Sequence, residues 1–296
     1  MLDLIIIGAG PAGLQAALTI GRMHRSAVVI DSGEYRNGPV QHMHNVIAND
    51  GTAPSAFREV ARGQLEQYDT VEYRRGSVVR VSPSADGFEV RLADGSVVAS
   101  SRLLLATGMA DDLPAVPGLA DLWGLRAFSC PFCDGHEFAG RRIGLIADSA
   151  RAEHVVRLLK PIVSGVTVFD DGRLNDDERA RLEALGADVH STPVASVSAA
   201  DDGVRVDAGS PVDVAGLFVA SGSARQRAPF AEQLGLRMLP SGAIEIDDFG
   251  RTSLPGVWAA GDLAHRASMP GVMASVTVAA SAGMVAGAMI VQELSS

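Results

Sequence analysis

Cysteine is scarce in this sequence of 296 residues: only two are present, and both lie in the segment Cys130-Pro131-Phe132-Cys133. No third cysteine is left to form a structural disulfide with either of them. In a reducing compartment such a close pair is more often catalytic or metal-binding than a cross-link. The N-terminal stretch MLDLIIIGAG also lacks the basic region and the cleavage site of a secretory signal peptide. We therefore expect a cytoplasmic protein.

Positive charge and aromatic side chains are also limited. The chain has 25 Lys and Arg residues against 35 Asp and Glu residues, a formal net charge of −10. Without a basic surface we expect no nucleic-acid partner and no binding to anionic membranes. Aromatic residues make up 5% and hydrophobic residues 47%, while glycine occurs 32 times. This balance is typical of an α/β protein with many tight turns.

Residues 271–291 contain no charged side chain, and their length is close to that of a membrane span. Ala, Gly, Ser, Thr and Val dominate the segment, and these residues insert weakly into membranes. We therefore expect no membrane span but a helix buried against a cofactor or a partner subunit. Its nonpolar surface favours a homodimer.

The hydrophobic pattern predicts two similar β-α-β units. The first runs through a strand at residues 4–7, a helix at 12–23 and a strand at 27–30. The second begins with a strand at 143–146 and continues through a helix at 152–159.

The run LLLATG at residues 103–108 is echoed by LFVASG at 217–222. This repeat predicts an α/β fold of two Rossmann-like, doubly wound, three-layer nucleotide-binding domains, with the second inserted into the first. We place the first domain at residues 1–112 and 243–296, and the inserted domain, which carries the cysteines, at 113–242.

A glycine-rich fingerprint, Gly8-Ala9-Gly10-Pro11-Ala12-Gly13, follows the first strand and opens the first helix. In this context Gly8 allows a tight turn, Gly10 leaves room for a pyrophosphate, and Gly13 lets helix and strand pack closely. The helix N-terminus then offers N–H groups to the phosphates. Asp31, at the end of the next strand, is placed to accept a hydrogen bond from an adenosine ribose.

This fingerprint does not distinguish FAD from NAD, whereas the later segment Ala260-Gly261-Asp262 favours FAD. There the Asp262 carboxylate can accept from a ribityl hydroxyl, and the following helix can direct its N-terminal amides at the flavin. GAGPAG, LLLATG, CPFCDG and GVWAAGD occur in this order along essentially the whole chain. In this the sequence resembles the pyridine nucleotide–disulfide oxidoreductases, and within them the low-molecular-weight thioredoxin reductases.

The resemblance implies FAD as cofactor and a set of residues around it. These are Gly8, Gly10, Pro11, Ala12, Gly13, Asp31, Ser32, Arg36, Asn37, His44, Ala106, Thr107, Gly108, Gly261, Asp262, Ala274 and Ser275. For His44, an ordinary position in a loop is an equal alternative.

The resemblance also assigns roles in the cysteine segment. Cys133 is expected to face the flavin, Cys130 to exchange with substrate, and Asp134 to handle the proton. His136 lies outside the reductase pattern and is either a second base or a bystander. Zinc would need about four ligands, and no second pair of cysteines supplies them, so we expect no metal.

The second β-α-β unit lacks its glycines. When its strand is aligned on that of the first unit, Ala147, Ser149 and Ala152 replace the three glycines, and Asp170 corresponds to Asp31. Added side-chain atoms would crowd a pyrophosphate, and Asp170 with its neighbour Asp171 would repel the 2′-phosphate of NADPH. NADPH is therefore doubtful as a cofactor.

The stretch Arg36-Asn37 followed by His42-Met43-His44 resembles dithiol oxidases that form disulfides in sulfur-containing natural products such as holomycin and gliotoxin. Those enzymes carry His after the second cysteine, where this chain has Asp134. We expect an FAD-dependent oxidoreductase that oxidises a small-molecule dithiol with molecular oxygen. The alternative is an enzyme that reduces a thioredoxin-like protein with NADPH or ferredoxin as donor.

Overall fold

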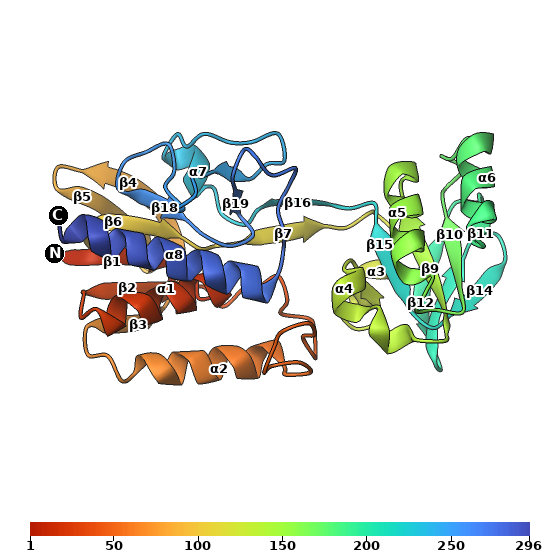
Figure 1. The fold of residues 1–296 in the computed structure, drawn as a ribbon, viewed down its shortest axis with the longest axis horizontal. Helices are drawn as coiled ribbons and strands as arrows, with labels where there is room; N and C mark the ends of the chain where they lie inside the picture. Colours follow the sequence, from red (N-terminus) through yellow and green to blue (C-terminus); the bar gives the residue numbers. More distant parts are fainter. The chain divides into compact units, whose positions relative to one another are not determined.

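The computed structural model describes residues 1–296, apart from the side chains of Ser149 and Ala150. The chain forms two compact units (Figure 1). The first consists of Met1–Gly38, Ser55–Ala110 and Ala224–Ser296, and the second of Pro39–Pro54 and Asp111–Ser223.

The first unit is built on a mixed sheet in the order β3-β2-β1-β6-β5-β4, with β18 also paired to β6. Strand β1 lies inside the sheet, and both of its faces are buried because Leu4 and Ile6 point to one side and Ile5 and Ile7 to the other. β3, β2, β1, β6 and β18 are parallel, and β4 and β5 are antiparallel. The strands are β1 (Leu2–Ile7), β2 (Ala27–Asp31), β3 (Val71–Arg75), β4 (Val78–Ser84), β5 (Gly87–Leu92), β6 (Val97–Leu105) and β18 (Val257–Ala259).

Helices α1 (Pro11–Arg22) and α8 (Val276–Leu294) pack together against one face of this sheet (Figure 1). Their backbones approach closely, because a Cβ added at Gly283 would collide with the carbonyl of Ala12. α8 is long and apolar enough to cross a membrane by length and composition. In this structure its buried side chains, among them Ala286 and Ile290, belong to the core of the first unit.

The second unit contains a parallel sheet in the order β11-β10-β9-β15-β8 and a separate antiparallel sheet of three strands. Its β-α-β unit consists of β9 (Arg142–Ala147), α5 (Ser149–Leu159) and β10 (Gly165–Phe169). The remaining elements are β8 (Ala127–Phe128), α6 (Asp176–Ala184), β11 (Asp188–His190), β12 (Ser196–Ala200), β13 (Gly203–Asp207), β14 (Pro211–Val214) and β15 (Leu217–Ala220).

Shorter elements complete both units. The chain leaves the first unit in β7 and returns in β16, and these two strands pair with each other. The shorter elements are α2 (Pro54–Leu65), β7 (Met109–Asp112), α3 (Leu119–Leu122), α4 (Pro131–Asp134), η1 (His136–Phe138), β16 (Ser223–Gln226), α7 (Phe230–Gln233), β17 (Ile244–Glu245) and β19 (Ala264–His265).

The boundaries of the compact units differ from the expected domains at residues 39–54, 111–112 and 224–242. Residues 224–242, expected in the inserted domain, pack with the first unit, because Phe230 and Leu234 share a core with Ile5 and Ile7. Residues 39–54, expected in the FAD-binding domain, cluster instead with the second unit. The predicted class, α/β with two nucleotide-binding units and one inserted into the other, is confirmed.

Candidate functional site: a nucleotide loop and a redox disulfide

The glycine-rich loop between β1 and α1 has the shape of a phosphate cradle. Gly8 has a φ of 106°, and a Cβ there would collide with the carbonyl of Ala106. A Cβ at Gly13 would collide with the carbonyl of Gly8, so this glycine allows helix and turn to touch. At Gly10, by contrast, a Cβ would meet no atom within 4 Å. The space beside Gly10 is therefore open, as a pyrophosphate requires.

The N-terminus of α1 is free to bind an anion. Its N-cap, Gly10, makes no side-chain hydrogen bond, Pro11 is at the first helical position, and no acid lies in the first turn. The exposed N–H groups and the helix dipole therefore favour a phosphate group here. The first unit thus fits the adenosine diphosphate part of FAD.

Other predicted cofactor residues gather around this loop. Thr107 lies beside Gly8, and a Cβ at Gly261 would lie 3.1 Å from the Cβ of Ala12. Gly108 has a φ of 67° and open space beside it. Asp262 is paired with Arg36, with 3.0 Å between Oδ2 and the guanidinium nitrogen.

Three further predicted residues lie at the edges of this region. Ser275 is the N-cap of α8 and makes no side-chain cap, and Ala274 before it is exposed. Ser32 is exposed beyond the end of β2, and its hydroxyl accepts from the N–H of Glu34 at 3.4 Å. Their contacts with a cofactor remain predictions.

Asp31 lies at the end of β2 as predicted, but the chain itself occupies its oxygens. Its side chain is 2% exposed and accepts hydrogen bonds from the hydroxyls of Tyr35 and Tyr73 and from the N–H of Ala9. Burial and hydrogen bonding to Asp31 raise the pKa of both phenols. A ribose hydroxyl would therefore share or replace these donors at Asp31.

An arginine holds the segment after Asp31 in place. The Arg58 guanidinium lies 3.8 Å from the ring centre of Tyr35 and donates to the Asn37 side chain at 3.0 Å. Burial lowers the pKa of Arg58. Asn37 is therefore engaged by a neighbouring helix, α2.

In the second unit, Cys130 and Cys133 form a disulfide with their Cα atoms 5.2 Å apart. Cys130 is the N-cap of α4, whose first residue, Pro131, suits the start of a helix. The N–H groups of Cys133 and Asp134 both donate to the Cys130 carbonyl at 3.1 Å. Phe132 points outward and is 68% exposed. The segment therefore presents an oxidised, partly accessible pair beside an exposed aromatic ring.

Asp134 is the strongest candidate for proton handling beside the disulfide. Burial and the charge of Glu137 raise the pKa of its carboxyl to about 6, although His44 acts in the opposite direction. A carboxyl that titrates near neutral pH can both accept and release a proton in a working cycle. Glu137 was not singled out from the sequence, although it lies three residues after Asp134.

Two histidines of the predicted site lie in the second unit. His44 lies in the 39–54 segment of the second unit, with its Nε2 3.5 Å from Glu137 and its Nδ1 3.6 Å from Asp50. It therefore lies near the disulfide segment of the same unit, through Glu137, and its contact with FAD remains a prediction. The side chain of His136 is exposed in η1, and its backbone carbonyl accepts from the N–H of Ala139 at 3.0 Å. Its catalytic role remains a prediction.

The turn between β9 and α5 is closed by the chain's own groups. Asp148 is the N-cap of α5, and its carboxylate accepts from the N–H of Arg151 at 3.1 Å. The Arg151 guanidinium donates to the carbonyls of Ala220 and Gly222 at 3.1 and 2.9 Å. A half-exposed carboxylate and a half-exposed guanidinium therefore lie at the carboxyl ends of β9 and β15, where a second nucleotide would bind.

The other residues expected to hinder NADPH binding also form hydrogen bonds or ion pairs within the chain. Asp170 is 1% exposed and accepts from the N–H groups of Gly172 and Leu174 at 3.0 and 3.3 Å. Asp171 pairs with Arg173 at 2.8 Å. Ala152 is fully buried, and the side chain of Ser149 lies outside the described part of the chain. The guanidinium of Arg173 is thus paired with an acid where a 2′-phosphate would bind.

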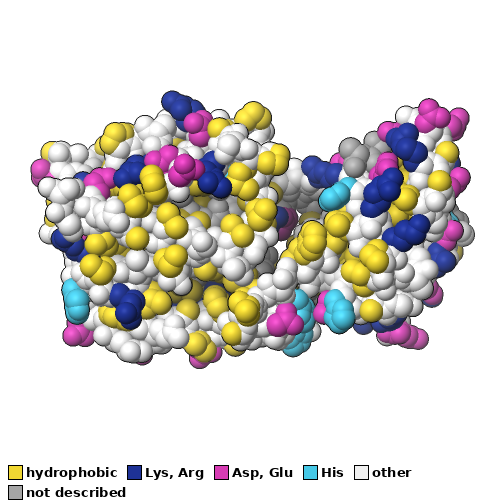
Figure 2. Space-filling model, viewed as in Figure 1, with side chains coloured by type: hydrophobic (Ala, Val, Ile, Leu, Met, Phe, Trp, Pro, Cys, Tyr) yellow, Lys and Arg dark blue, Asp and Glu magenta, His cyan; other side chains and the backbone are white. Residues whose placement is uncertain are grey.

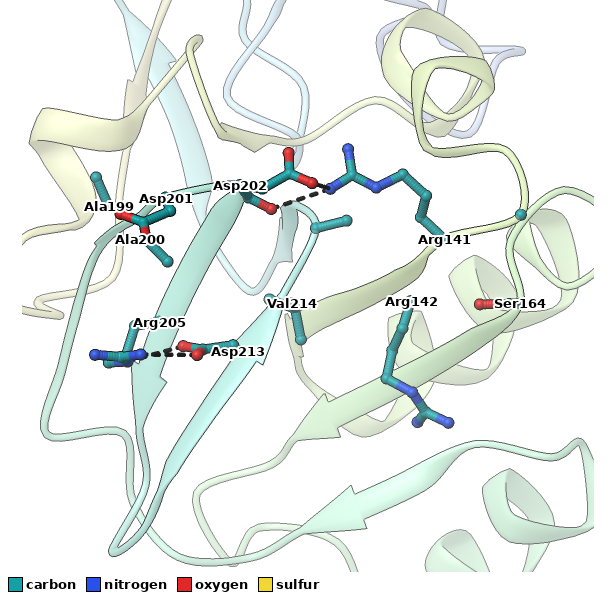
Figure 3. A pocket seen from close by; sticks show the side chains of 12 residues that line it. Arg141, Arg142, Ser164, Ala199, Ala200, Asp201, Asp202, Arg205, Asp213 and Val214 are labelled. Carbon is teal, nitrogen blue, oxygen red and sulfur yellow. Dashed lines mark hydrogen bonds and ion pairs between the residues drawn. The ribbon is translucent and has the colours of Figure 1, made fainter.

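A hollow of about 630 Å³ in the second unit lies among β12, β13 and β14 (Figure 3). Its arginines face acids, with Arg205 2.8 Å from Asp213 and Arg141 2.8 Å from Asp202. On the face shown in Figure 2, basic side chains are scattered among acidic ones. Among residues whose side chains are described, no group of three His, Cys, Asp or Glu is arranged to hold a metal ion.

Known proteins resemble the chain over its full length. The family model for pyridine nucleotide-disulphide oxidoreductases matches residues 2–158 and 161–283. "Thioredoxin reductase sirT" from Leptosphaeria maculans is 33% identical over 306 residues, which cover 96% of this chain and 93% of that protein.

Solved structures agree with this match. The putative thioredoxin reductase TrxB from Bacillus anthracis has a TM-score of 0.92 at 28% identity, over 100% of this chain and 99% of that one. HlmI has a TM-score of 0.89 at 34% identity, over 99% and 92% of the two chains. The first unit has a nucleotide-binding loop, and the second has a disulfide in a Cys-x-x-Cys motif. The chain belongs to the pyridine nucleotide-disulphide oxidoreductase family, whose thioredoxin reductase-like members act on disulfide groups.

Proposed function

We propose that this protein is an FAD-dependent dithiol oxidase. It would convert a small-molecule dithiol, R(SH)₂, and O₂ into the cyclic disulfide, RS₂, and H₂O₂. In this reaction two electrons and two protons leave the dithiol and are taken up by oxygen. Bound FAD would supply a two-electron acceptor that oxygen can reoxidise.

The observation that supports this direction is the closed turn between β9 and α5. The glycine-rich loop of the first unit is open, whereas Asp148 and Arg151 fill the corresponding place in the second unit. The residues present therefore do not fit a nicotinamide nucleotide. In this proposal the thiol substrate therefore supplies the electrons.

The chain's own residues divide the work at the disulfide. A substrate thiolate attacks Cys130, the bond between Cys130 and Cys133 breaks, and the electron pair remains on the Cys133 sulfur. The second substrate thiol then displaces Cys130, which leaves the substrate as a disulfide and the pair reduced. Burial and the charge of Glu137 raise the pKa of Asp134 to about 6, and this carboxyl would accept a substrate proton.

Anaerobic stopped-flow spectroscopy tests the direction. The FAD-loaded protein is mixed with dithiothreitol, NADPH or NADH, and absorbance is followed at the flavin band. We expect rapid bleaching by the dithiol and slow or no bleaching by either nucleotide. Admitting oxygen should restore the yellow colour and release hydrogen peroxide. Full bleaching by micromolar NADPH within a second would refute the oxidase proposal.

The names of the relatives support a second candidate, reduction of a thioredoxin-like protein. In that case electrons would flow from a donor to the disulfide and on to a protein partner. The same experiment, with reduced ferredoxin added as a further donor, separates the two candidates, because a reductase must accept electrons from NADPH or from ferredoxin. A reductase would also show little turnover of dithiol with oxygen alone.

We further infer that the protein is a cytoplasmic homodimer. Helix α8 and the segment before it expose Met273, Val278 and Met284 at 60%, 41% and 48%. A partner subunit that covers these side chains would remove nonpolar surface from water. Light scattering over a wide concentration range would refute the dimer if it gave the monomer mass throughout.

A further inference from the structure

Thiol–disulfide exchange needs a proton acceptor near the sulfur atoms. In the described part of the second unit, Asp134 follows Cys133 directly, and Glu137 and His44 interact with its charge. His44 comes from a different segment of the chain, more than eighty residues before the disulfide. Its arrival at this place is therefore a property of the fold and not of the cysteine motif.

The imidazole of His44 lies between two carboxylates. Its Nε2 is 3.5 Å from Oε1 of Glu137 in η1, and its Nδ1 is 3.6 Å from Oδ2 of Asp50 in its own loop. The side chain of His44 is 24% exposed, whereas those of Glu137 and Asp50 are 38% and 67% exposed. The ring is thus the more sheltered member of each pair.

The loop that carries His44 is anchored on both sides of the ring. Met43 is 6% exposed, its N–H donates to the Thr52 carbonyl at 2.9 Å, and its carbonyl accepts from the N–H of Gly51 at 2.9 Å. Val46 is 8% exposed, and the N–H of Asn45 donates to Asp50 at 2.7 Å. Buried apolar contacts and backbone hydrogen bonds therefore hold His44 in position.

We propose that His44 is a positioning residue for thiol–disulfide exchange: it holds the Glu137 carboxylate in the segment that follows the disulfide, where Asp134 accepts the proton of the incoming thiol. The proton passes from the thiol to the Asp134 carboxylate. A sulfur–sulfur bond forms to Cys130 as the bond to Cys133 breaks, and Cys133 keeps the electron pair. This role concerns the exchange itself and does not depend on which acceptor finally receives the electrons.

The charges of His44 and Glu137 predict opposite pH shifts for variants of these two residues. The groups that act on the Asp134 carboxyl are Glu137, which raises its pKa, and His44, which lowers it. His44→Gln should therefore move the onset of rapid exchange to higher pH, and Glu137→Gln should move it to lower pH. A change that only disturbed the structure would slow exchange at every pH.

The test is the rate of exchange with dithiothreitol between pH 5 and 8, on the FAD-loaded full chain without oxygen. Samples are quenched in acid and alkylated, and thiols at Cys130 and Cys133 are counted by mass spectrometry. This readout does not use the flavin, so it remains valid if the oxidase proposal fails. The ratio of variant to wild-type rates at each pH cancels the titration of dithiothreitol.

For a change of one pKa unit, the His44→Gln ratio should be about 0.1 at pH 5 and approach 1 at pH 8. The Glu137→Gln ratio should be about 5 at pH 5 and also approach 1 at pH 8. The matched control is His42→Gln, from the same loop, because the exposed His42 ring hydrogen-bonds to the Gly51 carbonyl and not to a carboxylate among the described residues. Its ratio should stay near 1.

Three results would overturn the proposal. The first is a His44→Gln rate ratio that does not depend on pH. The second is a His42→Gln control whose rate ratio changes with pH as that of His44→Gln does. The third is a shift of the pH profile in the same direction by His44→Gln and Glu137→Gln. If His44→Gln does not fold, His44→Asn takes its place with the same expected ratios.

Discussion

The two β-α-β units share a scaffold but differ in the turn that would hold a nucleotide. In the first sheet Ile7 pairs with Ile30 and Leu105, and in the second Ile146 pairs with Phe169 and Val219. These positions are equivalent. The helix N-cap Gly10 lies three residues after Ile7, whereas the N-cap Asp148 lies two residues after Ile146. The second turn is therefore one residue shorter.

The N-cap residue decides what each turn can bind. Gly10 contributes no side chain, so the first N–H groups of α1 remain available to a phosphate. Asp148 turns its carboxylate to the N–H of Arg151, and so supplies the negative charge that the helix end attracts. The turn of the first unit thus leaves its helix N-terminus open to a nucleotide. In the second unit, which carries the disulfide, the Asp148 side chain caps the helix instead. We therefore expect the first unit to bind FAD and the second to carry out the disulfide chemistry, and variants can test this.

The largest effect should come from the cysteines of the second unit. Cys130→Ser and Cys133→Ser should each abolish dithiol turnover, because a single thiol cannot close a disulfide, and both should leave FAD retention intact. Turnover is measured by oxygen uptake and retention by the flavin spectrum of the purified protein. Loss of FAD from either variant would contradict the proposed division between the units.

The two cysteine variants should also differ from each other. Cys130→Ser leaves Cys133, the residue expected to face the flavin, as a free thiolate, so a charge-transfer band should appear at long wavelength. Cys133→Ser should show none. A band in Cys133→Ser alone would reverse the roles assigned to the two thiols.

A second, smaller effect should follow from carrying the acid of the second unit into the first. Gly10→Asp would place a carboxylate about 4 Å from the bound phosphates, at a cost of roughly 1–4 kcal/mol. We expect FAD affinity to fall about a hundredfold, measured by titration of the apoprotein with FAD. Gly10→Ala should weaken binding less, by roughly 1–3 kcal/mol, because it adds only bulk.

Gly13→Ala is the matched control for Gly10→Ala. The Cβ at Gly10 meets no atom within 4 Å, so the apoprotein should keep its thermal stability. At Gly13 a Cβ collides with the Gly8 carbonyl, so the apoprotein itself should lose stability. Equal loss of stability in both apoproteins would remove the argument that Gly10 is reserved for the cofactor.

The sequence predicts local features of this molecule well. Strand β1 follows from a continuous apolar run, and the loop at Gly8 and Gly10 follows from glycine spacing between a strand and a helix. Contacts between distant segments escape such patterns. Arg151 reaches the carbonyl of Ala220, and His44 reaches Glu137, only because the fold brings them together.

The differences in domain boundary have the same origin. Residues 224–242 follow the second set of strands in sequence, but Phe230 packs on the core of the first unit. Asp31 likewise has a spacing typical of a ribose-binding acid, while Tyr73 on the neighbouring strand donates to it at 2.8 Å. The sequence pattern predicts which residue type lies at a strand end, but its packing and hydrogen-bond partners depend on the folded structure.

The smallest effect should come from removing the acid of the second unit. Asp148→Ala deletes the N-cap of α5 and should destabilise the protein by about 0.5–2 kcal/mol, seen as a small fall in the thermal midpoint of the second unit. Asn175→Ala, which removes the N-cap of α6 in the same unit, is the matched control and should cost a similar amount. Asp148→Asn keeps an acceptor at the cap and should restore most of the stability. None of these variants should let NADPH bleach the flavin, because Arg151 still donates to the carbonyls of Ala220 and Gly222. Rapid bleaching of Asp148→Ala by NADPH would show instead that a single carboxylate separates the two nucleotide loops.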